Sequence, residues 1–207
     1  MTPYPSNERA KSFDIWDDGS IFILTTENHV LSPRRDDFAR INVTGQNTWE
    51  DAITIKTYNG NIYLLESSRN QIQRHKPWVN GFSQKSNLLT TTQPGIFDFS
   101  IDGGIYLYTE DSKIIRFFSD KNILTPIILN KIPGEWSIDT TKTSAFITRS
   151  YLSYIYILNG DRIWIFKPDS KRFQDVKSWT YMGQFELKTD TVIKNISIPR
   201  DGTIYVT

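Results

Sequence analysis

One short pattern recurs along the whole chain and constrains its fold more than any other feature of the sequence. Four copies have a segment that alternates polar and apolar residues, a tight turn of Asp or Asn followed by Gly, and an apolar segment that starts with Ile and an aromatic residue; Ser100–Tyr108 is a compact example, and a fifth copy is less regular. Alternation with a period of two is typical of strands, and Asn-Gly or Asp-Gly between strands favours a hairpin. The sequence therefore predicts repeated β-hairpins.

The copies are spaced evenly enough to be the units of one repeat fold. The Ile residues that open the apolar segments follow one another at roughly 40–50 residues, which is the length of a β-propeller blade. Short β-branched segments between Gly, Asn and Asp exclude a helical repeat. We expect the aromatic residues that follow these Ile residues to pack between neighbouring blades. The aligned pairs are Ile21-Phe22, Ile62-Tyr63, Ile105-Tyr106, Ile155-Tyr156 and Ile204-Tyr205.

The sequence thus predicts an all-β fold, a β-propeller of about five four-stranded blade units, of which the last is incomplete in this chain. Residues 1–11 are predicted to form a flexible N-terminal arm, and residues 12–207 a single propeller domain, either complete or the C-terminal part of a larger protein. In the third unit Pro126–Leu129 is the expected outer strand. In the fourth unit Trp136–Asp139 is the expected first strand, followed by an insertion.

The turn and the strand after it resemble the blade core of NHL-type propellers and of the related six-bladed lactonase and gluconolactonase-like families. The resemblance covers nearly all of the chain after residue 11. It implies a propeller fold and leaves the activity open, because propellers host many activities. The signatures of WD40 repeats and of the sialidase Asp box are not matched. The segments that carry the resemblance are Asp18–Phe22, Asn59–Tyr63, Asp102–Tyr106 and Asp201–Tyr205.

Charge and residue content exclude several classes of function. The formal net charge of +1 lacks the basic excess of a general nucleic-acid binder. The absence of cysteine excludes disulfides, thiolate metal sites and cysteine nucleophiles. No apolar run reaches the roughly 20 residues of a membrane helix, so we expect no membrane insertion by this segment. The sequence fits either a cytoplasmic protein or an extracellular or surface-exposed part of a larger bacterial protein.

The number of units raises the question of how a ring would close. Three alternatives are open: the N-terminal arm adds a strand to the last blade, a five-bladed ring closes with one thin blade, or further blades lie upstream in a larger protein. An open propeller would leave unpaired strand edges, which favour pairing with another chain. We therefore expect closure by one of these routes or self-association through edge strands.

Polar residues on the first strands of the units are candidates for lining a central channel. Asp14 and Asp98 each lie four residues before the Asp of the following turn, and Ser197 lies four residues before Asp201; Ile55 occupies this position in the second unit. The resemblance to lactonase-like propellers implies that such groups would bind a divalent cation, although the sequence does not supply a full set of ligands. The simpler interpretation is a solvated channel without a ligand.

Tryptophans in the links between units are the other candidates. Trp49, Trp136 and Trp179 precede a following blade, and we favour a structural role over binding of a partner or a sugar. Trp78 lies in a turn-like link and is the better candidate for an exposed surface anchor. Tryptophan is enriched at binding hot spots, which gives this residue a functional interpretation.

The sequence assigns no catalytic residue. The two histidines, His29 and His75, lie apart from any cluster of carboxylates in the sequence. A Ser-His-Asp triad would need one of them, and no nucleophile elbow is present. No P-loop, dinucleotide fingerprint or EF-hand loop is present either.

These observations favour a non-catalytic interaction or ligand-recognition module that binds a protein or a small ligand on one propeller face. Two alternatives stay open. One is a metal-dependent, lactonase-like hydrolase that uses the channel carboxylates Asp14 and Asp98. The other is a carbohydrate-binding propeller that uses exposed Trp and Tyr residues. No cofactor is expected for the module, and a divalent cation is expected for the hydrolase.

Overall fold

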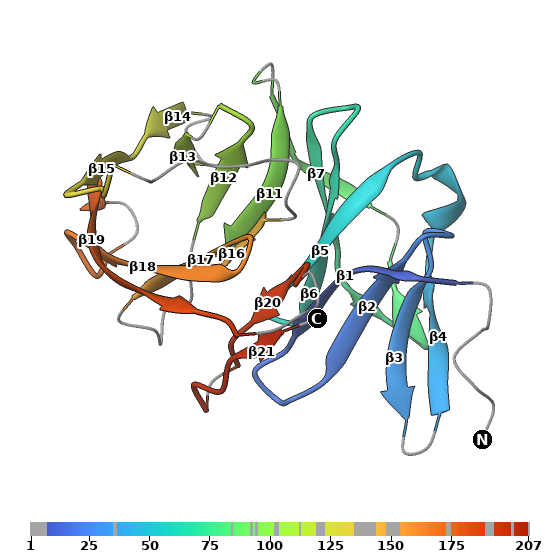
Figure 1. Cartoon of the computed structure of the whole chain (residues 1–207). Helices are drawn as coiled ribbons and strands as arrows, with labels where there is room; N and C mark the ends of the chain where they lie inside the picture. The colour runs from blue at the N-terminus through green and yellow to red at the C-terminus, as the bar shows by residue number, and fades with distance from the viewer. Residues whose placement is uncertain are drawn as a thin grey trace. The chain divides into compact units, whose positions relative to one another are not determined.

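The computed structural model is built of short β-strands joined by tight turns (Figure 1). The chain forms two compact units, residues 1–94 and residues 95–207. Within the described residues, no helix has the length and the hydropathy needed to span a membrane. The structure describes residues 8–34, 37–83, 85–91, 93, 95–101, 104–111, 113–118, 123–134, 144–147, 154–172, 175–188, 193–199 and 201–206.

Three predicted features fall wholly or partly outside the described residues. They are the arm up to residue 7, the Asp102-Gly103 turn and the segment Trp136–Asp139. The described end of the arm differs from the prediction, because Glu8 is buried and the first strand begins at Ala10. Ala10 and Lys11 therefore belong to the first sheet, and Glu8 and Arg9 are hydrogen-bonded to its second strand and the turn after it.

The first unit contains two sheets. In the first sheet, four antiparallel strands follow in sequence order, and two short strands from the second repeat extend it beyond β4. A 3-10 turn, Gln46–Thr48, leads to the second sheet. The first sheet has the order β1 (Ala10–Ile15), β2 (Ile21–Thr25), β3 (Val30–Arg34), β4 (Asp37–Val43), β9 (Gly81–Phe82) and β8 (Pro77–Trp78). The second has the order β5 (Ala52–Tyr58), β6 (Asn61–Glu66), β7 (Gln71–His75) and β10 (Ser86–Thr90).

The second unit contains a four-stranded sheet, a five-stranded sheet and a two-stranded hairpin. The first of these has the order β11 (Ile96–Ile101), β12 (Ile105–Thr109), β13 (Ile114–Phe118) and β14 (Ile123–Pro126). The next has the order β15 (Ile128–Asn130), β19 (Ser178–Glu186), β18 (Arg162–Pro168), β17 (Ile155–Asn159) and β16 (Ser144–Ile147). The hairpin pairs β20 (Ile196–Ser197) with β21 (Tyr205–Val206). The prediction of an all-β, propeller-like fold of four-stranded units is confirmed.

The prediction for the outer strand of the third unit is wrong. Pro126–Leu129 does not form that strand, because β14 ends at Pro126 and β15 leaves the sheet. β15 pairs in parallel with β19 of the next sheet instead. In the fourth unit the innermost described strand is β16, which lies after the segment expected to hold it.

The turns explain why the repeat has its residue pattern. In the second unit Asn59 and Gly60 both have positive φ, 45° and 77°, as a type I′ hairpin turn requires. In the first and fifth units the side chain of the turn Asp accepts a hydrogen bond from the backbone N–H two residues later. The distances are 2.8 Å from Ser20 to Asp18 and 2.9 Å from Thr203 to Asp201. Asp before Gly thus fixes the turn locally.

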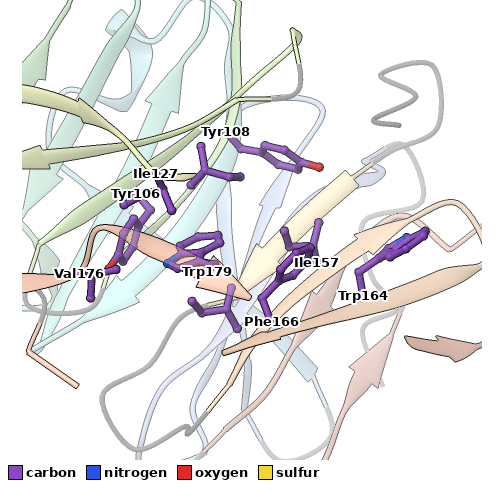
Figure 2. Packing of buried hydrophobic residues seen from close by; sticks show 10 residues of the cluster. Tyr106, Tyr108, Ile127, Ile157, Trp164, Phe166, Val176 and Trp179 are labelled. Carbon is purple, nitrogen blue, oxygen red and sulfur yellow. The ribbon is translucent and has the colours of Figure 1, made fainter. Parts of the chain in front are cut away.

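Hydrophobic clusters join neighbouring sheets within each unit. In the first unit Phe22 packs with Trp49 and with apolar residues of β5 and β6. In the second unit the side chain of Trp179 lies among those of Tyr106, Ile127 and Phe166 (Figure 2). Its ring centroid is 5.1 Å from that of Tyr106 and 6.4 Å from that of Phe166. The predicted structural role of Trp49 and Trp179 is confirmed, and each buried aromatic side chain contributes about 1.5–3 kcal/mol.

The repeat aromatics follow the prediction in all but the last unit. Phe22, Tyr63 and Tyr106 are buried. Tyr156 is half-buried and packs against a third cluster formed around Ile196. Tyr205 is 44% exposed, because β21 pairs on one side with β20 and has no further partner strand among the described residues.

The β8–β9 hairpin requires a glycine at position 81, and substitution of this residue tests the requirement. A Cβ atom on Gly81 would lie 2.0 Å from the backbone oxygen of Asn42, whereas one on Gly19, also at positive φ, would meet nothing within 4 Å. We expect Gly19→Ala to lower the free energy of unfolding by about 1 kcal/mol through backbone strain. Gly81→Ala should cost about 1–3 kcal/mol more, because the clash adds to the strain. Urea unfolding of both variants measures this; equal losses would show that the close approach is relieved without cost.

Candidate functional site

The predicted channel residue Asp14 joins the two sheets of the first unit. Its side chain is fully buried on β1. Its Oδ2 accepts hydrogen bonds from the backbone N–H of Thr57, at 2.7 Å, and from the hydroxyl of the same residue, at 2.9 Å. Two residues earlier on β1, Ser12 Oγ accepts a hydrogen bond from the backbone N–H of Ile55 at 3.3 Å. Polar side chains of β1 therefore satisfy backbone donors of β5, which a buried amide requires.

The strand register corrects which polar residues are equivalent. Asp14 lies opposite Phe22, and Ser197 lies opposite Tyr205, so these two residues match. The residue opposite the repeat aromatic in the second unit is Lys56, not Ile55.

Asp98 does not match Asp14, because Ser100 faces Tyr106 and Asp98 faces Tyr108. The segment between the first and second strands is shorter in the third unit, and counting back from the turn therefore shifts the alignment by two residues. The equivalent of Asp98 in the first unit is Ser12, which faces Leu24.

The structure places each of the three candidate channel residues on the first strand of its sheet and buries it. Asp98 lies on β11, where its Oδ1 accepts from the backbone N–H of Phe99 at 2.8 Å, and Ser197 lies on β20. Among the residues that the structure describes, no three His, Asp or Glu side chains gather as metal ligands would. Lining of a channel by Asp14, Asp98 and Ser197 stays a prediction.

A buried carboxylate that the sequence did not reveal anchors the start of the first sheet. Glu8 accepts hydrogen bonds from Thr25 Oγ1 at 2.8 Å and Arg40 Nη2 at 2.6 Å, and it lies 3.0 Å from His29 Nδ1. Burial by itself would raise the pKa of Glu8, but the hydrogen bonds outweigh it and lower the pKa below its ordinary value. His29 thus lies beside a single carboxylate that is distant in the sequence.

The predicted anchor Trp78 lies at the tip of the β8–β9 hairpin and is 70% exposed; the next residue, Val79, is 76% exposed. The predicted exposure is confirmed. The hairpin is held from below by Phe82, whose ring lies 5.8 Å from that of Phe22 and 6.4 Å from that of Trp16. An exposed tryptophan on a fixed support is typical of a contact site.

The side chains around Trp78 form one exposed face across three strands. Trp78 pairs with Gly81, and Gly81 pairs with Asn42, so Trp78 and Asn42 lie on the same face with a bare glycine between them. Two positions further along, just beyond the ends of β8, β9 and β4, lie Lys76, Ser83 and Thr44. The backbone N–H of Ser83 donates to the carbonyl of Lys76, and that of Thr44 donates to the carbonyl of Phe82. We call this surface the hairpin face; its residues are Asn42, Thr44, Lys76, Trp78, Gly81 and Ser83.

Sequence reasoning found Trp78 but missed the rest of the hairpin face. Asn42 and Thr44 come from the first repeat, and a parallel pairing between repeats brings them to the hairpin. The one local signal was Asn80-Gly81, with φ of 63° and 156°, which has the composition of a hairpin turn. Nothing in the sequence indicates that this turn docks on β4.

His75 supports the hairpin from inside the unit. It is fully buried at the end of β7, its Nδ1 lies 2.8 Å from the carbonyl oxygen of Ser83, and its ring meets that of Trp49 edge-on at 5.4 Å. Burial lowers the pKa of His75, and the charge of Lys85 adds to the effect, while the Ser83 carbonyl opposes it. The neutral imidazole is the form that the fold stabilises.

Comparisons with known proteins identify the fold. No protein-family model matches the chain. No curated protein matches it either. Among solved structures, virginiamycin B lyase from Staphylococcus aureus is similar over 100% of this chain and 65% of its own, with 13% identity and a TM-score of 0.52. This chain belongs to the β-propeller type of fold. Two further structures agree with that assignment.

A protein of unknown function from Bacteroides thetaiotaomicron is similar over 97% of this chain and 53% of its own, with 13% identity and a TM-score of 0.63. Glutaminyl cyclase from Myxococcus xanthus is similar over 99% and 88%, with 11% identity and a TM-score of 0.61. This chain thus spans less than two thirds of the length of the lyase and of the Bacteroides protein. At these identities the likeness shows the propeller fold alone, and the resemblance to NHL or lactonase-like propellers stays a prediction.

The bond between Asp14 and Thr57 predicts a measurable coupling between sheets. We expect Thr57→Val, which removes the hydroxyl donor, to lower the free energy of unfolding by about 1.5–3 kcal/mol, because the acceptor is a buried carboxylate. Thr57→Ser keeps the hydroxyl and should lose less. In a double-mutant cycle with Asp14→Ala, the losses should fall short of additivity; additive losses in urea unfolding would mean that the two side chains do not interact.

The buried His75 predicts a loss of stability in mild acid. Its pKa in the folded protein is below the ordinary value of 6.5, so the unfolded chain binds more protons below that pH. The stabilisation is fully present above about pH 6.5 and declines as the pH falls toward the folded pKa. Glu8 affects stability only below about pH 4.5, outside this window. Urea unfolding between pH 7.5 and 5.5 should show a steeper decline for the parent protein than for His75→Gln; parallel curves would contradict this role.

Proposed function

We propose that this protein is a ligand-recognition module that binds through the hairpin face of its first unit. The observation that carries the proposal is the exposure of Trp78 on a hairpin that is held on three sides. β9 is paired with β4, Phe82 is packed beneath it, and the carbonyl of Ser83 meets buried His75. A rigid aromatic anchor loses little conformational freedom on binding, and that favours affinity.

Two other tryptophans of the chain are buried, so the exposure of Trp78 is specific to its hairpin. Trp49 and Trp179 are buried in the clusters that join sheets. Trp78 has a neighbour, Val79, that is also exposed, so the tip presents two large apolar side chains to solvent. Removing such side chains from water is a source of binding free energy.

The proposed recognition module does not involve β1 and β11, the strands that carry Asp14 and Asp98. The described bonds of Asp14 run to β5, and those of Ser12 run to the same strand. Their contacts support a role in joining sheets. The lactonase-like alternative would need these carboxylates to face a substrate, and it stays a separate prediction about Asp14 and Asp98.

The experiment is a binding survey with matched variants. Immobilised parent protein, Trp78→Ala and Phe185→Ala are exposed to panels of glycans, peptides and metabolites; Phe185 is an exposed aromatic residue on β19 of the second unit. We expect Trp78→Ala to lose at least about tenfold in affinity for the ligands retained by the parent, as a hot-spot residue does, with an unchanged melting temperature. Phe185→Ala should bind normally. Equal binding by Trp78→Ala, or no ligand in any panel, would overturn the proposal.

A further inference from the structure

The hairpin face combines an aromatic ring with hydrogen-bonding groups in a flat array. Trp78 and Asn42 lie at the two ends of one row, two strand spacings apart, which is about 9–10 Å. Gly81 lies between them and has no side chain, so only backbone atoms separate the two side chains on this face. The second row adds the hydroxyl of Thr44, whereas the hydroxyl of Ser83 accepts a hydrogen bond from the backbone N–H of Lys76 at 3.2 Å. A ligand that spans the distance between the two ends of the first row would contact both the indole of Trp78 and the amide of Asn42.

The single charged residue of the hairpin face, Lys76, is positive. Lys76 is exposed and lies just before β8, where the backbone N–H of Ser83 donates to its carbonyl. Because this bond continues the pairing of the hairpin, alternation places the Lys76 and Trp78 side chains on the same side. Arg40 lies on the same side of β4 as Asn42, but its guanidinium is paired with Glu8 at 2.6 Å. The six residues of the hairpin face include no carboxylate. The Lys76 ammonium is therefore available to a ligand with negative charge.

We propose that the hairpin face binds a saccharide that carries a carboxylate group, such as a uronic acid or a sialic acid. The proposal rests on the proposed function and names its ligand class. The C–H groups on one face of the sugar ring pack against the negative face of the Trp78 indole. Sugar hydroxyls exchange hydrogen bonds with the Asn42 amide, which offers both donors and an acceptor. The carboxylate lies near Lys76.

A peptide or a neutral sugar would match the hairpin face less completely. A peptide that added a strand would pair with the free edge of β8, but Pro77 in this two-residue strand has no N–H to donate. A neutral sugar would leave Lys76 without a role. The aromatic ring, the amide and the ammonium together are complementary to an acidic sugar.

The test compares acidic and neutral sugars that differ in the carboxylate. Sialyllactose is paired with its neutral methyl ester, and oligogalacturonate with its methyl-esterified form of equal length, by titration calorimetry at low and high ionic strength. We expect the parent protein to bind the acidic member about fivefold tighter at low ionic strength, and this preference to shrink in high salt. Equal affinity for both members, or no binding of any sugar, would overturn the proposal.

Two variants and their matched controls assign the preference to residues. Lys76→Gln should abolish the preference for the acidic sugar and leave the affinity for the neutral one unchanged, whereas Trp78→Ala should lose at least about tenfold for both. The controls are Lys177→Gln and Phe185→Ala, which replace exposed residues of the second unit. A Lys76→Gln variant that keeps the preference would overturn the role of Lys76.

The binding survey separates failure of this inference from failure of the proposed function. If a peptide or metabolite binds in a manner that depends on Trp78 while every sugar fails, the recognition module stands and the saccharide assignment is wrong. If no ligand depends on Trp78, both are wrong.

Discussion

The parallel pairing of β9 with β4 is the contact on which the hairpin face of the first unit depends. Strands of two residues, such as β8 and β9, do not form a stable sheet by themselves. The pairing is possible because Gly81 brings its backbone against the oxygen of Asn42 without a Cβ atom. Phe82 then fills the space beneath, between Trp16 and Phe22. One glycine and one phenylalanine thus fix the position of an exposed tryptophan.

In both units, strands of one repeat join the sheet of the neighbouring repeat and so connect the two repeats. The first sheet receives β8 and β9 from the second repeat, and the sheet of β16–β19 receives β15 from the third. In both cases the added strand pairs in parallel with the last strand of the receiving sheet, β9 with β4 and β15 with β19. On the inner strands of the first unit, buried hydrogen bonds from Asp14 and Ser12 to β5 add a second connection. Blades of a repeat fold contact only their neighbours, so such connections contribute directly to stability.

The sequence predicted the hairpins well because their causes are local. Asn59-Gly60 adopts the positive φ angles that the turn requires, and Asp18 bonds to a residue two positions away. Equivalence between units was predicted less well. Counting residues from each turn matched Asp98 with Asp14, but register depends on turn length, and one change of two residues moved the match to Ser12. His29 and Glu8 are distant in sequence, and only the folded sheet brings them together.

The sequence by itself determined the all-β repeat, the four-stranded unit, the burial of most repeat aromatics and the exposure of Trp78. These follow from residue periodicity and turn chemistry, which act over a few neighbouring positions. The tertiary structure alone decided that Asn42 and Thr44 share a face with Trp78, that Ile128–Asn130 joins the next sheet, and that Asp14 bonds to Thr57. Each of these contacts joins segments from different repeats, and their pairing depends on which edges and donors the folded sheets leave open.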